Sequence, residues 1–270
     1  MLEFWHVPRL ATLDRQCRLS LCLMLGSAAL AACTQQRADD ESRLPLRQVQ
    51  DSGQNRALSF DGLDDYATTG TAQFPIGSGT QTISAWFEVE SIAGKHALIT
   101  LRKDGDSGIE FALQDGLLGA WRTYGNRTLV VATTPVTTGV WHHAAYTFDG
   151  TTNQIYLDGA LVANSTNEPN ERTPTTCWLG TLDGTNDLFK GTVDDFRVFN
   201  VARSSAQIAA EAAGNVSSDE PGLVLYLPCN ELGGNLIYDH SPLANDGQLG
   251  DGIEPRLPRR VASGTPDDGT

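Results

Sequence analysis

The stretch WHHAAYTFDGTTNQIYLDGALV, residues 141–162, decides the fold of this chain. It contains three short apolar runs, separated by Asp-Gly pairs at 149–150 and 158–159. An Asp-Gly pair between apolar runs is a strong hairpin signal, because glycine adopts positive φ without strain and aspartate tolerates it better than most residues. The stretch therefore predicts three consecutive antiparallel strands, to which the rest of the chain is expected to add further strands.

Short apolar runs and glycine-rich turns continue on both sides of this stretch. Residues 81–90, QTISAWFEVE, alternate between an apolar face and a more polar face, as a half-buried strand does. Only residues 204–213 carry a helical pattern, with Ser204 as the expected N-cap and Gly214 as the stop. Turn signals about every eight to twelve residues are typical of a sandwich. The expected fold class is therefore all-β, a two-sheet antiparallel sandwich with one short helix on the C-terminal side.

Four segments also carry a family resemblance. They are ALSFDGLDDYA (57–67), TISAWFEVE (82–90), the stretch at 141–162, and FKGTVDDFRVFNVARSSAQI (189–208). In this order they resemble the LamG-like jelly roll of the concanavalin A-like lectin/glucanase superfamily. The resemblance covers roughly residues 57–213 and implies a jelly-roll sandwich.

Residues 222–250, GLVLYLPCNELGGNLIYDHSPLANDGQLG, are similar to the segment that usually opens such a domain, yet here they follow it. Either this segment closes the same sandwich or it is the start of a truncated second module. We favour the first arrangement, because Leu223, Leu225 and Leu227 would cover a sheet face and a truncated module could not bury them. We therefore expect one jelly roll over residues 56–250, followed by a disordered tail at 251–270.

The start of the chain predicts export. Residues 1–32 have basic residues followed by an apolar run of signal-peptide length, and the run ends in a Leu-Ala-Ala-Cys quartet at 30–33. The quartet resembles a bacterial lipobox, which implies a lipidated Cys33; an ordinary secretory signal is the alternative. Thr34, in place of aspartate, implies outer-membrane sorting if the organism has two membranes. Residues 33–55 lack apolar periodicity and are expected to be a flexible tether.

Charge excludes some partners. The chain has 33 acidic residues against 19 basic residues, a formal net charge of -14, and no basic cluster. Nucleic acid is therefore excluded as a partner, and contact with a membrane is expected only through the lipid anchor.

Two cysteines, Cys177 and Cys229, remain in the predicted domain. Disulfides persist in exported proteins, so we expect this pair to be bonded. Two buried free thiols are the alternative.

Acidic residues gather in several turns. Oxygen ligands on loops suit Ca²⁺, although aspartate next to glycine is also ordinary turn chemistry. If the first and last of these loops meet, a structural calcium ion is expected on Asp61, Asp64 and Asp194.

Aromatic residues at strand ends and on polar faces suggest a ligand surface, because exposed rings stack on sugars. The candidates are Trp86, Trp121 and Tyr124, for which packing in the core or at an edge is the alternative. Glu88 and Glu90 share a strand face but lie at its end, where solvated charges are common. No carboxylate pair of glycosidase type stands out, so no catalytic residue is predicted.

These observations lead to a lipid-anchored, non-catalytic binding module of the cell envelope that recognises a polysaccharide or an extracellular protein. A structural or adhesion protein that acts by protein contact without a sugar site is the first alternative. A divergent glycosidase is the second. Exposure of the three candidate aromatic residues in one groove would favour a sugar site, and their burial would favour protein contact.

Overall fold

The computed structural model describes residues 55–266, apart from residues 76–78, 104–106, 170–172 and 216. Every described residue lies in one compact unit, Gln50–Thr270. The predicted signal peptide, lipidated Cys33 and nearly all of the tether fall on residues 1–54, outside the described part. No helix in the described part combines the length and the apolar character needed to cross a bilayer.

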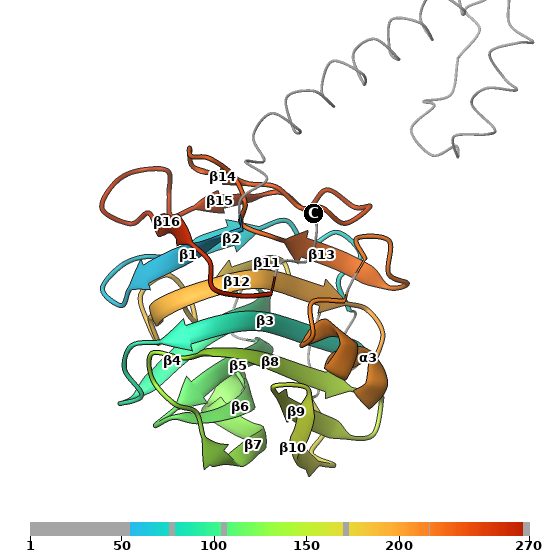
Figure 1. Cartoon of the computed structure of the whole chain (residues 1–270). Helices are drawn as coiled ribbons and strands as arrows, with labels where there is room; N and C mark the ends of the chain where they lie inside the picture. Colours follow the sequence, from blue (N-terminus) through green and yellow to red (C-terminus); the bar gives the residue numbers. More distant parts are fainter. Residues whose placement is uncertain (1–54, 76–78, 104–106, 170–172, 216, 267–270) are drawn as a thin grey trace, which may run out of the picture. The chain divides into compact units, whose positions relative to one another are not determined.

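The described residues form two antiparallel sheets of eight strands each, as expected for a jelly-roll sandwich (Figure 1). Sheet I follows the order β10-β9-β8-β3-β12-β1-β16, and β13 also pairs with β12. Its strands are β10 (Ala160–Ser165), β9 (Asn153–Leu157), β8 (Trp141–Phe148), β3 (Gln81–Val89), β12 (Lys190–Phe199), β1 (Arg56–Asp61), β16 (Arg259–Ala262) and β13 (Leu223–Leu227).

Sheet II follows the order β14-β15-β2-β11-β4-β5-β6-β7. Its strands are β14 (Leu236–Ile237), β15 (Gly247–Leu249), β2 (Ala67–Thr69), β11 (Thr176–Leu179), β4 (Lys95–Lys103), β5 (Ser107–Gln114), β6 (Leu117–Arg122) and β7 (Arg127–Pro135). The predicted meander is present as β8, β9 and β10, with positive φ at both residues of the Asp-Gly turn between the last two.

The late segment completes sheet I. In register, β1 pairs with the first half of β12 through Leu58 opposite Val193. β13 pairs with the second half of the same strand through Leu225 opposite Val198. Because β3 occupies the other side of β12, β1 and β13 lie end to end on one side of it (Figure 1). The leucines of β13 are thereby buried, and none of this strand is left in solvent.

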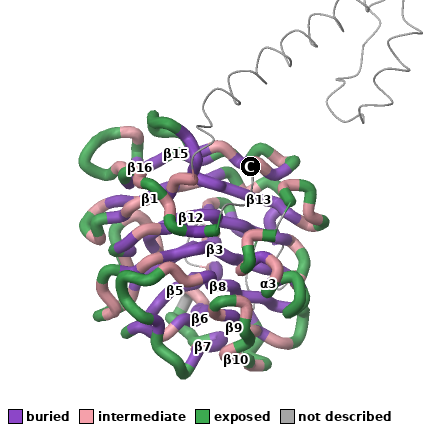
Figure 2. Tube along the Cα trace, viewed as in Figure 1, coloured by how far each residue is buried: buried purple, intermediate pink, exposed green. Residues whose placement is uncertain are grey.

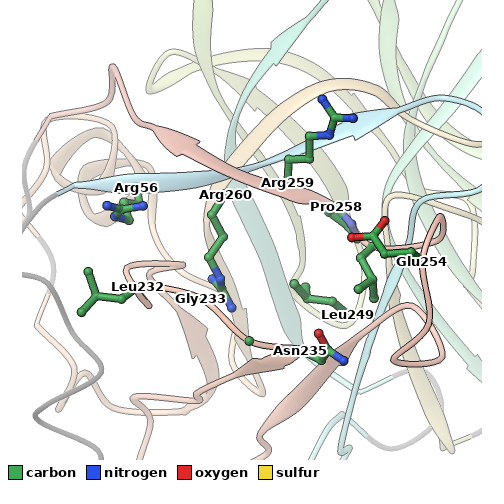
Figure 3. Close-up of a pocket in the computed structure, with 11 residues that line it drawn as sticks. Arg56, Leu232, Gly233, Asn235, Leu249, Glu254, Pro258, Arg259 and Arg260 are labelled. Atoms are coloured by element: carbon green, nitrogen blue, oxygen red, sulfur yellow. The ribbon is translucent and has the colours of Figure 1, made fainter.

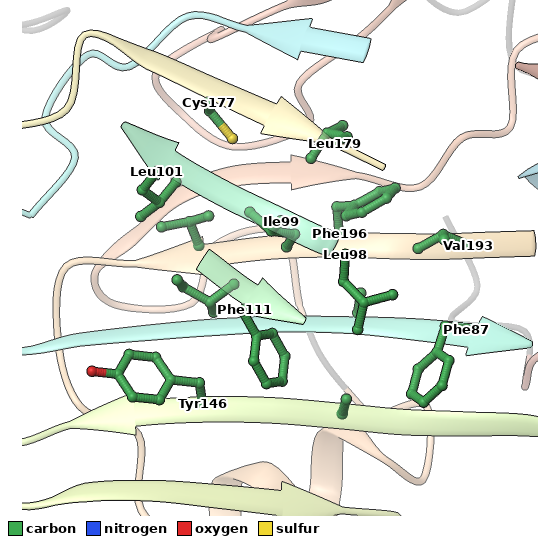
Figure 4. Close-up of a cluster of buried hydrophobic side chains, with 14 of the residues drawn as sticks. Phe87, Leu98, Ile99, Leu101, Phe111, Tyr146, Cys177, Leu179, Val193 and Phe196 are labelled. Atoms are coloured by element: carbon green, nitrogen blue, oxygen red, sulfur yellow. The ribbon is translucent and has the colours of Figure 1, made fainter. Parts of the chain in front are cut away.

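The core lies between the two sheets. Phe87 and Tyr146 from sheet I and Phe111 from sheet II are each fully buried and point into one cluster (Figure 4). Figure 2 shows that buried residues follow the strands and exposed residues gather in the loops. Since burying one large apolar side chain stabilises by about 1.5–3 kcal/mol, this layer is the main source of stability.

One short helix, α3 (Ser205–Glu211), packs on part of the outer face of sheet I (Figure 1). Ser204 caps it as predicted: its side chain accepts a hydrogen bond from the Gln207 backbone N–H, and the Gln207 side-chain oxygen accepts one from the Ser204 backbone N–H. Ile208 of the helix packs on Ala145 and Tyr156 of the sheet, away from the main core. Both faces of sheet I are therefore buried along the middle of the sheet.

The expectation of a disordered tail from residue 251 is wrong for residues 251–266. Residues 259–262 form β16, whose Arg260 pairs in register with Leu58 of β1. Arg260 also forms an ion pair with Glu231 at 2.6 Å. The open edge of β1 offers backbone donors and acceptors with which an extended segment can form hydrogen bonds. Because β1 is far from this segment in the sequence, local composition does not reveal the pairing.

The expected disulfide is also wrong, because Cys177 and Cys229 are both free and buried. Cys177 belongs to β11 in sheet II, whereas Cys229 follows β13 of sheet I. Burial raises the pKa of the Cys177 thiol to about 12 and the pKa of Cys229 well above its usual value. Both side chains therefore pack as small apolar groups, which is the alternative arrangement.

Candidate functional site

The outer face of sheet II carries a row of aromatic and polar side chains. Each of four neighbouring strands contributes one residue to the row, in register: Trp178 of β11, Thr100 of β4, Glu110 of β5 and Trp121 of β6. On the other side of Trp178 stands Thr68 of β2. Adjacent strands lie about 4.8 Å apart, so the two tryptophans are separated by about 14 Å across the face.

The accessible end of this row is an aromatic pair. The Tyr66 and Trp178 rings lie 5.4 Å apart at an angle of 56°, and both residues are half-buried. Gly184 lies beside them with φ +86°, and a Cβ atom there would approach the Trp178 ring to 3.2 Å. The glycine therefore both permits the turn and leaves room for the indole.

The loop at 181–187 borders the aromatic pair with ordered polar groups. Asp183 accepts hydrogen bonds from the backbone N–H groups of Thr185 and Asn186 and forms an ion pair with Arg102 at 3.2 Å. Burial alone would raise the pKa of Asp183, but the hydrogen bonds from Asn186 and Thr185 outweigh it and lower the pKa. Asp183 is therefore a fixed anion beside the rings, with exposed amide and hydroxyl groups next to it.

The other end of the row is closed. The Lys95 ammonium bonds to Glu110, lies 4.6 Å above the Trp121 ring and is 3.7 Å from Asp187. Glu110 and Trp121 are consequently buried. Burial raises the pKa of Glu110 to about 7, although Lys95 opposes the increase. Burial thus favours the protonated carboxyl, and the lysine covers it.

An acidic cluster lies directly before Tyr66 in the chain. Asp61, Asp64 and Asp65 bring one carboxylate oxygen each to within 4.8 Å of one another. Burial, together with repulsion from Asp61 and Asp64, raises the pKa of Asp65 to about 6. A divalent cation would relieve this repulsion, so the three carboxylates fit a hard cation such as Ca²⁺.

The predicted calcium ligands are only partly brought together. Asp61 and Asp64 lie in the acidic cluster, but Asp194 does not join them. The β1–β12 register places Asp61 opposite Lys190, four residues along β12 from Asp194. Asp194 instead accepts hydrogen bonds from the Ser263 and Thr265 hydroxyls at 2.5 and 3.0 Å. Burial and the neighbouring Asp195 raise its pKa to about 8.

The predicted aromatic surface is not one groove. Trp86 lies on sheet I, 8% exposed and packed against His143, whereas Trp121 lies on sheet II and is 4% exposed. Tyr124 belongs to a short 3-10 helix (Tyr124–Asn126), and its side chain lies outside the described part. The alternation of β3 did place Trp86 on the face away from the core, but the residue is buried there against His143.

Sequence reasoning missed the pair that is accessible, Tyr66 and Trp178. A signal was present for Trp178, because strand alternation puts it on the face opposite Cys177 and Leu179. No local pattern places Tyr66 beside it, since the two residues are more than a hundred positions apart and meet only through the pairing of β2 with β11.

The chain belongs to the concanavalin A-like lectin/glucanases superfamily, whose model matches residues 60–209. No curated protein matches the sequence. Among solved structures, the fold is similar to that of a candidate carbohydrate-binding protein from Bacteroides ovatus, with a TM-score of 0.58 and 18% identity over 79% of this chain. The match spans 61% of that protein.

A second similar structure is the native heptameric SAP-like pentraxin from Limulus polyphemus, with a TM-score of 0.53 and 12% identity. It is matched over 74% of this chain and 96% of the pentraxin. At these identities the two likenesses establish the fold.

Proposed function

We propose that this protein is a non-catalytic glycan-binding module, exported and held at the cell envelope by a lipid on Cys33. The observation that carries the proposal is the half-exposed Tyr66–Trp178 pair beside the polar loop at 181–187. Support also comes from the Bacteroides ovatus protein of similar fold, which is itself a candidate carbohydrate-binding protein.

The chemistry of the aromatic pair suits a sugar. An aromatic ring offers an apolar face to the C–H groups of a pyranose, and well-placed polar groups beside it then fix the hydroxyls. Here Asp183 supplies acceptors, while Arg102 and Asn186 supply donors within the same surface. Because Asp183 is held by its own loop, the site is ordered before a ligand arrives, which reduces the entropy lost on binding.

A structural calcium ion on the acidic cluster is part of this proposal, with Asp65 in the place first expected for Asp194. The Asp61 backbone N–H donates to Asp65 at 2.8 Å, and the Leu63 backbone N–H donates to Asp61 at 2.7 Å. These bonds hold the loop in shape while leaving further carboxylate oxygens for a cation. A bound ion would fix the segment that leads into Tyr66.

Binding without cleavage is the simpler expectation, although one carboxyl resembles a general acid. Glu110 has a pKa raised to about 7, but it is 1% exposed and lies under Lys95. A general acid must reach the glycosidic oxygen at hydrogen-bond distance. We therefore expect no release of reducing sugar from any glycan that binds.

The proposal is tested by affinity electrophoresis against a panel of soluble polysaccharides, followed by calorimetry. Replacing Trp178 with alanine should weaken binding about tenfold, which corresponds to roughly 1.4 kcal/mol of lost ring contact. Trp141→Ala is the matched control, since Trp141 is another half-buried tryptophan but lies on sheet I. Equal affinity of the Trp178→Ala variant and the parent would overturn this site.

Anchoring is tested separately in cells that express the full chain. Wild type should appear in the membrane fraction and incorporate labelled palmitate, whereas a Cys33→Ala variant should do neither. A wild-type chain that is released from cells without label would contradict the anchor and leave the glycan site untouched.

A further inference from the structure

The last described residues cross the outer face of sheet I. After β16, the Ser263 backbone N–H donates to the Asn55 carbonyl at 3.1 Å, and the chain then passes in front of β12 (Figure 1). We call residues 263–266 the strap. None of them belongs to a hydrophobic cluster of the described part, so polar contacts hold the strap to the sheet.

The strand before the strap is held more firmly. Arg260 of β16 points into a cavity of about 300 Å³, where it pairs with Glu231 at 2.6 Å (Figure 3). The same guanidinium donates to the Leu236 carbonyl at 2.7 Å, and β16 also pairs in register with β1. The strap has no described strand partner, so it can leave the sheet while β16 stays in place.

Two hydroxyls of the strap bind one carboxylate oxygen. Ser263 Oγ and Thr265 Oγ1 donate to Oδ2 of Asp194 at 2.5 and 3.0 Å, and they lie 2.9 Å from each other. Hydroxyls on adjacent carbons of a sugar ring are also within hydrogen-bond distance of each other and can donate together to one carboxylate. The strap therefore binds Asp194 with the same pair of groups that a sugar would offer.

This carboxylate lies beside an indole on the same face of sheet I. Asp194 is opposite Trp86 in the register of β12 with β3, and residues in such positions have Cβ atoms about 5 Å apart. Both are covered, since Asp194 is 1% exposed and Trp86 is 8% exposed. The strap also lies against Trp141, because a Cβ atom on Gly264 would come within 2.7 Å of that indole nitrogen. A ring next to a polar group that fixes hydroxyls is the combination that suits a sugar, but here it is closed.

We propose that Asp194 and Trp86 form a second sugar site on sheet I, which the strap closes. The two strap hydroxyls occupy the positions where two adjacent hydroxyls of a sugar would bind. The inference rests on the proposed function for its class of ligand but not on the Tyr66–Trp178 pair, which belongs to sheet II. Only molecules in which the strap has left Asp194 bind sugar here, so a variant that opens the strap gains affinity.

The hydroxyl pair also specifies the sugar, because the second site requires two free hydroxyls on adjacent ring carbons. Each sugar within a xylan chain keeps such a pair. Each sugar within a laminarin chain is linked through the middle one of its three ring hydroxyls, so adjacent hydroxyls remain only at chain ends. Soluble xylan and laminarin are therefore the two probes, and only xylan is expected to bind more tightly when the strap opens.

The test uses full-length chains that all carry Trp178→Ala, which removes the first site. Adding Ser263→Ala and Thr265→Val takes both hydroxyls from Asp194. In calorimetry this double variant should bind xylan about tenfold more tightly than the Trp178→Ala parent, with no gain for laminarin. Acrylamide should quench its tryptophan fluorescence more strongly, because the strap no longer shields Trp141. A further Asp194→Ala substitution should remove the gain in xylan affinity.

Gly264→Val opens the strap by a second route, since it keeps both hydroxyls but forces the strap away from Trp141. It therefore tests the site even if the double variant does not fold. Its matched control is Gly233→Val, because a Cβ atom on Gly233 would meet nothing within 4 Å. Gly264→Val should gain xylan affinity and Gly233→Val should not.

The outcomes separate this site from the first one. Equal xylan affinity of the opened chains and the Trp178→Ala parent would overturn the second site, as would unchanged quenching. The first site stands in that case if the wild-type chain binds glycan and Trp178→Ala weakens the binding. Xylan binding confined to the opened chains would instead support the second site and overturn the Tyr66–Trp178 site.

Discussion

The outer faces of the two sheets carry similar residue types, but these side chains differ in how far they are exposed to solvent. On sheet I, Glu211 of α3 is part of a buried polar cluster with His143, Arg197 and Arg203, in which Glu211 lies 3.6 Å from His143 and 3.5 Å from Arg203. On sheet II no helix of the described part covers the face, and Tyr66 and Trp178 remain half-exposed beside Asp183.

The difference shows which polar side chains hold the fold and which are available to a ligand. Charges removed from water must be neutralised inside the protein. Glu211 meets this requirement, because burial alone would raise its pKa, but His143 and Arg197 lower the pKa to about 2. Asp183 and its neighbours keep contact with solvent, so their hydrogen bonds can be exchanged for those of a ligand. The predictions below separate the two faces.

The largest effect is expected for Glu211→Ala. The substitution leaves Arg203 and Arg197 buried without their shared carboxylate, and removing one partner of a buried ion pair typically destabilises by about 3–5 kcal/mol. Urea unfolding measures the loss, with Glu220→Ala as control, because Glu220 also pairs with Arg203 but is partly exposed. A loss below about 1 kcal/mol would mean that the cluster does not hold α3 to sheet I.

The next largest effects are expected at the two ends of the row on sheet II, Trp121 and Trp178. Trp121→Ala removes a buried ring and is expected to destabilise by about 3 kcal/mol, whereas Trp178→Ala removes a half-exposed ring and should lower stability by roughly half as much. Only the second variant should lose glycan affinity. The same unfolding assay and the calorimetry distinguish them, and a Trp121→Ala variant that folds normally but binds no glycan would show that the closed end opens to ligand.

Stability should depend on pH in opposite senses on the two sides of pH 4. Folding raises the pKa of Asp194 from 3.8 to about 8 and that of Glu110 from 4.5 to about 7, mainly by burial. Between those values the folded state binds more protons than the unfolded state, so the free energy of unfolding falls as pH rises through this window. Glu211, with its pKa lowered to about 2, instead loses its stabilising effect as pH falls from about 4.5.

Asp194→Asn tests the predicted decline in stability as pH rises. Asparagine can still accept hydrogen bonds from Ser263 and Thr265 but cannot ionise, so the decline in stability from pH 5 to pH 8 should become shallower by more than about 1 kcal/mol. Asp115→Asn, at an exposed turn, should leave the slope unchanged. Parallel pH profiles for the Asp194→Asn variant and the parent would contradict the assignment.

The smallest expected effect concerns calcium. At pH 7, adding millimolar Ca²⁺ should raise the melting temperature by a few degrees, because an ion that binds only the folded state stabilises it in proportion to ligand excess. Asp64→Asn should abolish the shift, and Asp219→Asn, at an exposed loop, should retain it. A shift that survives Asp64→Asn would place any calcium elsewhere.

Much of the fold was predictable because its signals are local. The alternation in residues 81–90 correctly separates the core face of β3 from its outer face, and Ser204 with Gln207 marks the start of α3. Neither signal reports what covers the outer face. Trp86 was therefore expected to be a candidate ligand contact, although it is 8% exposed and packs against His143.

The candidate site was less predictable, because its members meet only through strand pairing. Asp61 and Asp64 were expected together from their spacing, but joining Asp194 to them required a register that local sequence does not specify. The free thiols of Cys177 and Cys229 have the same explanation: the presence of two cysteines in an exported domain says nothing of which sheet each belongs to.

The sequence by itself determined the strands, their turns and the all-β class, since Asp-Gly turns and period-two alternation act over a few residues. Tertiary structure alone decided which polar and aromatic side chains stay accessible. Accessibility depends on which distant strand pairs with a given strand and which segment packs on the outer face of a sheet, as β16 and α3 show. The free energy of such contacts is summed over residues far apart in the chain.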